Sequence, residues 1–369
     1  MTGPHFTPLA QSLPATVPFV GPETQERARG RPFRARLGAN ESAFGPSPAA
    51  QAAIAAAAAG AWMYGDPEAW DLRQAIAAHH GTTPAHVLAG EGIDGILGLL
   101  VRLMIGPGDR AVTSDGAYPT FAYHVAGFGG QLVRVPYRGH HEDPAALCAK
   151  AAEVGAKLLY LANPDNPLGS WHSGSDISAL LDHLPPGTLL VLDEAYVDLA
   201  PAEAVPDLAA EDPRVIRLRT FSKGYGLAGL RVGYALGAPE LIAAFDKVRN
   251  HFGLGRIAQA GALAALQDQA WLGQVRQAVQ AGRDALGDIA RQNGLIPLPS
   301  ATNFVAIDCG GTGDFARTVL RELLARDIFV RMPGVAPLDR CIRVSIGDAA
   351  AIDAFGAALP DALRAARGG

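Results

Sequence analysis

The chain has 369 residues, of which 49% are hydrophobic and 18% are charged, and its formal net charge is −5. This length predicts about two domains and allows a large core that needs no disulfide or metal support. The apolar composition excludes a disordered chain. The mild negative charge argues against a generally basic nucleic-acid binder.

The first 35 residues are rich in proline and glycine, which predicts an ordered arm or a loop. A helix is expected over residues 67–80, because Asp66 can serve as its N-cap and Gly81 can end it. Beyond it, short apolar runs alternate with helical segments at 144–154 and 176–184. The runs cover residues 110–114, 131–136, 157–162, 188–193, 215–219 and 231–236.

Apolar strands separated by helices predict an α/β fold with a mostly parallel sheet covered on both faces. Such sheets bind ligands at the carboxyl ends of their strands. After residue 255 the sequence changes to long alanine-rich helical stretches (258–293) and a short α+β segment (303–366). We therefore expect a large domain at 46–255 and a small domain at 256–369. Residues 1–45 would form an arm that completes the small domain.

The cysteines, Cys148, Cys309 and Cys341, lie far apart and match no zinc or redox spacing. This sparse, odd count predicts buried thiols in a reducing compartment, hence a cytoplasmic protein. The N-terminal residues lack a basic segment, and the longest apolar stretches, 49–61 and 95–106, are shorter than the ~20 residues of a membrane helix. The paired histidines fit surface turns better than a metal site.

Reactive side chains follow two of the predicted strands. Asp193 ends the strand at 188–193 and precedes Tyr196, and Lys223 lies in a Ser/Gly-rich loop after the strand at 215–219. Taken alone, this lysine fits a surface position best, and a phosphate-binding charge or a Schiff-base nucleophile are the two functional alternatives. The neighbouring Thr220, Ser222 and Arg231 suit a phosphate. A buried carboxylate that faces a pyridinium nitrogen, with a lysine at the aldehyde, is what pyridoxal phosphate requires.

Motifs in this order resemble those of fold-type I, pyridoxal-phosphate-dependent aminotransferases, and most closely the histidinol-phosphate aminotransferase branch. They are Leu37-Gly-Ala-Asn40-Glu41, Asn163-Pro-Asp-Asn166-Pro-Leu-Gly169, Asp193-Glu-Ala-Tyr196 and Ser222-Lys223 through Arg231. The likeness runs from about residue 37 to 350. It implies a large domain with a seven-stranded type of sheet between helices, and a smaller α+β domain. The implied activity transfers an amino group from an amino acid or a phosphorylated amino alcohol to a 2-oxo acid such as 2-oxoglutarate.

The resemblance also implies roles for single residues. Lys223 would bind the cofactor and move the substrate proton, Asp193 would pair with the ring nitrogen, and Tyr118 would stack on the ring. Tyr196 and Asn166 would hold the ring oxygen. The phosphate would be bound by Gly92, Ile93 and Asp94 at a helix N-terminus, by Thr220, Ser222 and Arg231, and by Tyr64 of the partner subunit. The enzyme would then be a homodimer with shared active sites. The substrate would contact Arg343, Arg331, Asn40 and Phe19.

Some residues depart from the branch pattern. Pro18-Phe19 stands where a Pro-Tyr pair is usual, Leu168 replaces threonine, and residues 90–94 are unusual. The amino donor therefore stays open. Arg249 and Arg256 are hypothesised to face the partner's pocket.

Three other readings remain at this point. The same scaffold serves decarboxylases of phosphorylated amino acids and non-catalytic binding modules. A nucleotide-dependent oxidoreductase is disfavoured, because Gly224-Tyr-Gly226 lacks the dinucleotide-binding context.

Overall fold

The computed structural model describes residue 3, residues 5–15 and residues 19–368, so Pro18 lies outside the described residues. The helices are α1 (Pro8–Ser12), α2 (Pro22–Arg29), α3 (Pro48–Ala58), α4 (Trp70–His79), α5 (Gly92–Met104), α6 (Pro119–Gly127), α7 (Pro144–Val154), α8 (Gly174–Leu180), α9 (Pro239–Ala244), α10 (Arg256–Gln267), α11 (Gln269–Gln292), α12 (Gly313–Ala325) and α13 (Ala349–Gly368). The strands are β1 (Ala35–Arg36), β2 (Val87–Gly90), β3 (Arg110–Ser114), β4 (Gln131–Val135), β5 (Leu158–Ala162), β6 (Leu189–Asp193), β7 (Val215–Thr220), β8 (Gly233–Leu236), β9 (Ile296–Pro297), β10 (Phe304–Asp308), β11 (Ile328–Phe329) and β12 (Cys341–Ser345).

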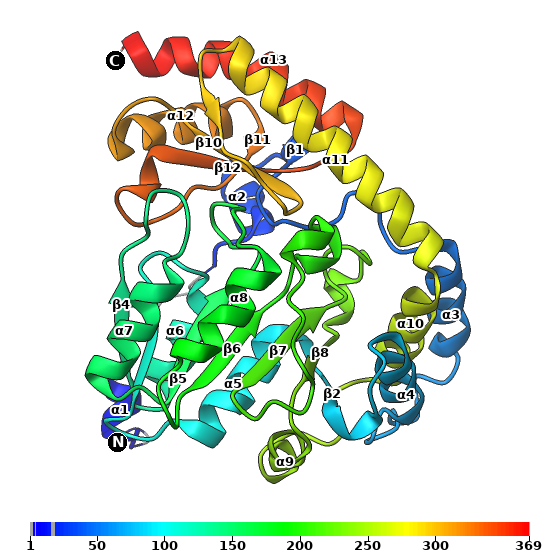
Figure 1. The fold of residues 1–369 in the computed structure, drawn as a ribbon. Coiled ribbons are helices and arrows are strands. Elements are labelled where there is room, and N and C mark those ends of the chain that lie inside the picture. The colour runs from blue at the N-terminus through cyan, green and yellow to red at the C-terminus, as the bar shows by residue number, and fades with distance from the viewer. Residues whose placement is uncertain (1–2, 4, 16–18, 369) are drawn as a thin grey trace.

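A seven-stranded sheet with the order β2-β8-β7-β6-β5-β3-β4 forms the centre of the molecule (Figure 1). The strands from β7 to β4 run parallel, and β8 is antiparallel to both of its neighbours. The predicted α/β fold with a mostly parallel sheet is confirmed. All six predicted strands are present, and β2 adds a seventh that the sequence reading did not include.

Side chains of successive residues on the central strands enter different cores. On β6, Leu189 and Val191 pack with residues of α5 and α6, whereas Leu190 and Leu192 pack with residues of α7 and α8. This period of two explains why the strands read as continuous apolar runs, since both faces are covered. Each fully buried leucine contributes roughly 1.5–3 kcal/mol. Asp193 is the point at which this apolar run ends.

The C-terminal part forms a separate sheet. β10 lies between β9 and β12 in antiparallel pairing, and residues of α11, α12 and α13 share one core with it. In Figure 1 most of these elements lie above the central sheet, and α11 runs from the top of the molecule down its side toward α3 and α10. β1 pairs in parallel with β11, so the N-terminal segment joins this part. The domain limits at residues 45 and 255 stay a prediction.

The predicted starts of two helices need correction. The helix expected from Pro67 begins at Trp70, because Asp66 instead accepts hydrogen bonds from the amides of Glu68 (3.0 Å) and Trp70 (2.8 Å) and forms a turn. Ala69 has a left-handed backbone (φ 47°), which interrupts any earlier helix. The N-terminal segment, predicted as an ordered arm or a loop, contains two short helices, α1 and α2.

The helix predicted at 176–184 begins earlier, at Gly174, because the side chain of Ser173 caps it by accepting from the amide of Asp176. Cys148, Cys309 and Cys341 are all buried free thiols. Among the described residues, no helix is long and apolar enough to cross a membrane.

Candidate active site

A cavity of about 730 Å³ lies at the carboxyl ends of three central strands. Its wall includes Ala162, Asp193 and Thr220, the last residues of β5, β6 and β7. All the predicted site residues line it except Gly92 and Tyr64. The structure thus brings together residues from position 19 to position 343, including Phe19, Asn40, Ile93, Asp94, Tyr118, Asn166, Asp193, Tyr196, Thr220, Ser222, Lys223, Arg231, Arg331 and Arg343.

Lys223 extends from the loop after β7 into this cavity. Its Nζ donates a hydrogen bond to the main-chain oxygen of Asn40 (2.9 Å) and lies 5.7 Å from the centre of the Tyr196 ring. Burial and, next, the charge of Arg343 lower the pKa of Lys223 to about 8. About a tenth of this amine is therefore uncharged at pH 7, and the uncharged form is what a nucleophile or a general base requires.

Asp193 is buried at the end of β6, with 4% of its surface exposed. Its Oδ2 accepts a hydrogen bond from the Tyr160 hydroxyl (2.6 Å), and its Oδ1 accepts from the amide of Ala195 (2.9 Å). Burial raises the pKa of Asp193 to about 6, although both hydrogen bonds oppose this shift. The carboxylate is thus anchored and poised to accept a further donor from the cavity.

Asn40 connects the N-terminal segment to the phenol of Tyr196. Its Nδ2 donates to the Tyr196 hydroxyl (3.0 Å), and its Oδ1 accepts from the Ser345 hydroxyl at the end of β12 (2.8 Å). Burial raises the pKa of Tyr196 to about 12, so this phenol keeps its proton at neutral pH. It can then donate a hydrogen bond to an oxygen in the cavity.

The N-terminus of α5 and the loop after β7 form one corner of the cavity. Ser222 Oγ accepts from Thr220 Oγ1 (2.9 Å) and from Arg231 Nη1 (3.2 Å). Gly92 opens α5 with φ +74°, and a Cβ there would lie 2.6 Å from Arg231 Nη2. Among the described residues no side chain caps α5, so its first amides can bind an anion.

Asp94 lies in the first turn of α5, and its side chain does not cap the helix. Its Oδ2 lies 3.6 Å from Arg231 Nη2 and accepts a long hydrogen bond from the Tyr118 hydroxyl (3.5 Å). The side chain therefore links the anion corner to the aromatic wall of the cavity.

Two further arginines, Arg331 and Arg343, line the cavity. Arg343 donates to Asn166 Oδ1 (2.5 Å). The Nδ2 of Asn166 is then the atom that can donate a hydrogen bond into the cavity. Arg331 donates to the main-chain oxygen of Val20 (2.5 Å), and the backbones of Arg331 and Arg343 exchange two hydrogen bonds (3.2 and 2.6 Å). Phe19 stacks on Tyr118 with 6.1 Å between ring centres. Arg343 Nε is buried and has no partner among the described residues, so its N–H can donate a hydrogen bond to an anionic ligand.

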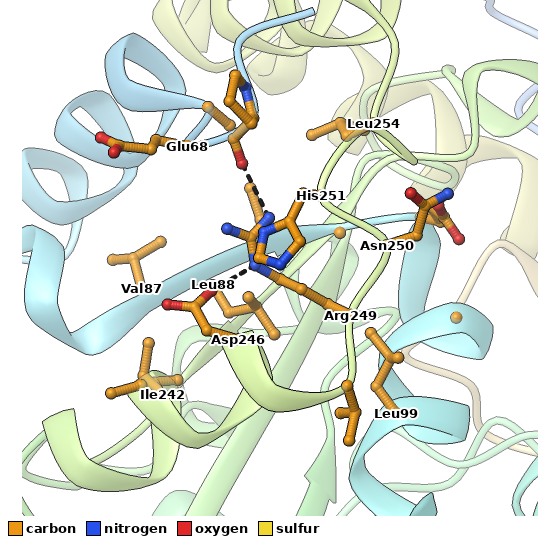
Figure 2. Close-up of a pocket in the computed structure, with 18 of the residues that line it drawn as sticks. Glu68, Val87, Leu88, Leu99, Ile242, Asp246, Arg249, Asn250, His251 and Leu254 are labelled. Atoms are coloured by element: carbon orange, nitrogen blue, oxygen red, sulfur yellow. Dashed lines mark hydrogen bonds and ion pairs between the residues drawn. The ribbon is translucent and has the colours of Figure 1, made fainter.

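Tyr64 lies outside this cavity, with 76% of its surface exposed, and it packs on Phe252 at 4.7 Å between ring centres. Arg256 Nη2 donates to the main-chain oxygen of Tyr64 (3.0 Å). Arg249 pairs with Asp246 (2.5 Å) and donates to the main-chain oxygen of Pro67 (2.8 Å) within its own chain. Figure 2 shows these contacts of Arg249 in a second cavity of about 1190 Å³.

Sequence reasoning missed Tyr160, which also lines the first cavity. It lies on β5, in the run that was read only as an apolar strand. A phenol two residues before the end of an otherwise aliphatic strand was the available signal. The main-chain contacts of Asn40, which depend on residues far away in the chain, had no such signal.

These residues fit pyridoxal phosphate. The corner at Gly92 is open because that residue lacks a Cβ, and its amides, hydroxyls and guanidinium suit a phosphate. Asp193 suits a protonated ring nitrogen, and the lysine amine lies in the same cavity. The unpartnered Nε of Arg343 suits the anionic group of a substrate.

Comparisons with known proteins agree with this geometry. The family model for class I and II aminotransferases matches residues 35–359. The histidinol-phosphate aminotransferases of Moorella thermoacetica and of an Anaeromyxobacter species are 35% and 40% identical, over 98% and 88% of this chain and 94% and 91% of theirs.

A crystal structure of histidinol-phosphate aminotransferase from Sinorhizobium meliloti in complex with pyridoxal-5'-phosphate has a TM-score of 0.95 and 53% identity, and the match covers 98% of both chains. The chain therefore belongs to the class I and II aminotransferases, and it is a transaminase that depends on pyridoxal phosphate.

Proposed function

We propose that this enzyme transfers the amino group of histidinol phosphate to a 2-oxo acid such as 2-oxoglutarate. The observation that carries the proposal is the pair of adjacent arginines, Arg343 and Arg331, in the wall of the cavity. Two guanidinium groups suit the two negative charges of a phosphate monoester. Relatives that are 35–53% identical bear the name of this activity, which supports the same donor.

Pyridoxal phosphate, when bound, supplies an aldehyde that takes up the amino group and a protonated ring that withdraws electrons. We assign its ring nitrogen to Asp193, its ring oxygen to Tyr196 and Asn166, and its ring face to Tyr118. Its phosphate would contact the first amides of α5 and the side chains Thr220, Ser222 and Arg231.

Lys223 has two tasks in this scheme. It holds the cofactor through its Nζ, and after release its uncharged amine takes the proton from the α-carbon of the donor. The lowered pKa of about 8 makes this form available near neutral pH. Arg343 orients the donor, because its guanidinium is fixed by Asn166 and by the main-chain oxygen of Gly38 (3.2 Å).

The donor can be identified from the absorption spectrum of the purified holoenzyme in the absence of any 2-oxo acid. We expect histidinol phosphate to convert the cofactor band to that of the pyridoxamine form at lower concentration than any other donor. Histidinol, which differs only by the missing phosphate, is the matched control. Its kcat/KM should be about 10- to 100-fold lower, since it loses charge-assisted hydrogen bonds to the arginines.

Equal conversion by histidinol and histidinol phosphate would contradict a phosphate-binding role for the arginines. Fastest conversion by an aspartate or an aromatic amino acid would overturn the proposed donor. Release of carbon dioxide without an acceptor would indicate decarboxylation on the same scaffold.

We further infer that two copies of the chain share their active sites. An exposed group of apolar side chains surrounds Tyr64: Trp62, Met63 and Phe252 are 83%, 40% and 50% exposed. Such a patch is typical of a protein interface. It lies next to the chain segment that Arg256 holds through the main-chain oxygen of Tyr64. In the proposed dimer, Tyr64 donates to the cofactor phosphate of the partner subunit.

Subunit complementation tests this arrangement. Tyr64→Ala and Lys223→Ala chains with different tags are expressed separately and together, and the hybrid is isolated by both tags and weighed by native mass spectrometry. Each variant alone should be nearly inactive. The hybrid should recover activity, because one of its two sites is intact, and a random mixture should reach about a quarter of the wild-type value. A purified hybrid without recovered activity would show that Tyr64 acts within its own subunit, whereas a Tyr64→Ala protein that is active by itself would show that Tyr64 has no role at the site.

We place the enzyme in the cytoplasm. The three buried free thiols support this setting, since a reducing compartment keeps cysteines unpaired.

A further inference from the structure

Tyr160 makes the shortest described contact to the carboxylate that we assign to the cofactor ring nitrogen. Its hydroxyl donates to Asp193 Oδ2 at 2.6 Å. The strand register explains this approach: Ala162 of β5 lies opposite Asp193 of β6, so Tyr160 stands one diagonal step back on the same face. Both side chains are buried, and the phenol is fully excluded from solvent.

The phenol of Tyr160 is held in place from the helix side as well. Its ring stacks on Phe121 of α6, with 4.9 Å between ring centres and 16° between ring planes. Phe121 is itself fully buried. Because β5 and the stacked ring of Phe121 both hold the Tyr160 side chain, its hydroxyl contacts Asp193 in a single orientation.

We propose that Tyr160 is a positioning residue that keeps the Asp193 carboxylate charged and aimed at the cofactor, so that the shared proton stays on the ring nitrogen. The inference rests on the role proposed above for Asp193. Each carboxylate oxygen has two lone pairs. The hydroxyl of Tyr160 and the amide of Ala195 occupy one on each oxygen, which leaves acceptor capacity for the ring nitrogen.

The surroundings explain why such a donor is needed. Burial favours the neutral form of Asp193, and nearby carboxylates add to this effect, whereas the Tyr160 hydroxyl is the strongest influence in the opposite direction. Lys223 lines the same cavity. The other ionisable side chains that influence or are influenced by Asp193 are Asp94, Glu194, Glu142, Asp165, Tyr118 and Tyr196.

The test compares Tyr160→Phe with the wild-type holoenzyme reconstituted with ring-¹⁵N-labelled pyridoxal phosphate. We expect the ¹⁵N chemical shift to move from the protonated toward the neutral pyridine value, and kcat to fall about 10-fold. A second readout uses the cofactor-free protein, in which infrared difference spectra against Asp193→Asn follow protonation of the carboxyl. The pH at which half of the Asp193 carboxyl is protonated should rise by about one pH unit in Tyr160→Phe.

Tyr234→Phe is the matched control, since Tyr234 is equally buried and its hydroxyl bonds to His80 (2.9 Å) rather than to Asp193. It should leave both the ¹⁵N shift and the infrared midpoint unchanged. An unchanged ¹⁵N shift and infrared midpoint in Tyr160→Phe would overturn the inference. Both readouts are independent of the amino donor, so an error in the proposed donor would not affect them.

Discussion

Replacing Lys223 with alanine is expected to reduce transamination at least about 10³-fold, because the same amine holds the cofactor and carries the substrate proton. The structure offers Lys223 for both tasks: its Nζ lies in the cavity with Asp193 and Tyr118, and its pKa is lowered to about 8. The rate of glutamate formation from 2-oxoglutarate and the donor measures this loss. The absorption maximum of the bound cofactor should also shift away from its wild-type wavelength.

The control for this prediction is Lys157→Ala. Lys157 pairs with Asp109 (2.7 Å) at the surface, where an ion pair contributes little. Its removal should leave the rate and the spectrum as in the wild type. If Lys223→Ala retained a rate close to that of the wild type, the central assignment would fail. Circular dichroism melts should show that both variants are folded.

Replacing Glu194 with glutamine is expected to lower the free energy of unfolding by about 3–5 kcal/mol. Glu194 follows Asp193 directly and has a fully buried carboxylate, which pairs with Arg217 (2.9 Å) and Arg219 (2.8 Å) of β7. Removing its charge leaves two buried or nearly buried guanidinium groups without their shared counter-ion. Urea denaturation followed by tryptophan fluorescence measures the effect.

The stability that Glu194 provides through Arg217 and Arg219 should depend on pH in a defined direction. Burial opposes ionisation of Glu194, but Arg219 and Arg217 together outweigh it and lower its pKa from 4.5 to about 2. An acid with a lowered pKa stabilises the fold above its unfolded-state pKa. The stability difference between wild type and Glu194→Gln should therefore be full above pH 4.5 and decline as the pH falls toward about 2.

Glu153→Gln is the control for Glu194, since its pair with Lys150 (2.5 Å) is exposed. That substitution should change the free energy of unfolding by less than about 1 kcal/mol. Equal effects of the two substitutions would contradict the buried-pair interpretation. A Glu194→Gln protein too unstable to purify would agree with it, and Glu194→Asp would then give a measurable intermediate.

Local patterns in the sequence were sufficient to predict the central sheet. Apolar runs with β-forming residues gave six of its seven strands, and the position of Asp193 at the end of one run located the edge at which the cavity lies. This works because a strand buried on both faces must be apolar along its length, so the first charged residue marks its end. The start of α4 was misread, because Asp66 can cap a helix or close a turn with the same side-chain oxygen.

The sequence by itself determined the strands, the side chains at their carboxyl ends and the family resemblance, since each of these lies in a short stretch of chain. Only the tertiary structure decided which distant groups meet. β1 pairs with β11, and Asn40 thereby reaches Tyr196 and the amine of Lys223. The register of β5 on β6 brings Tyr160 to Asp193. Such contacts depend on packing between segments far apart in the chain, and no local propensity records them.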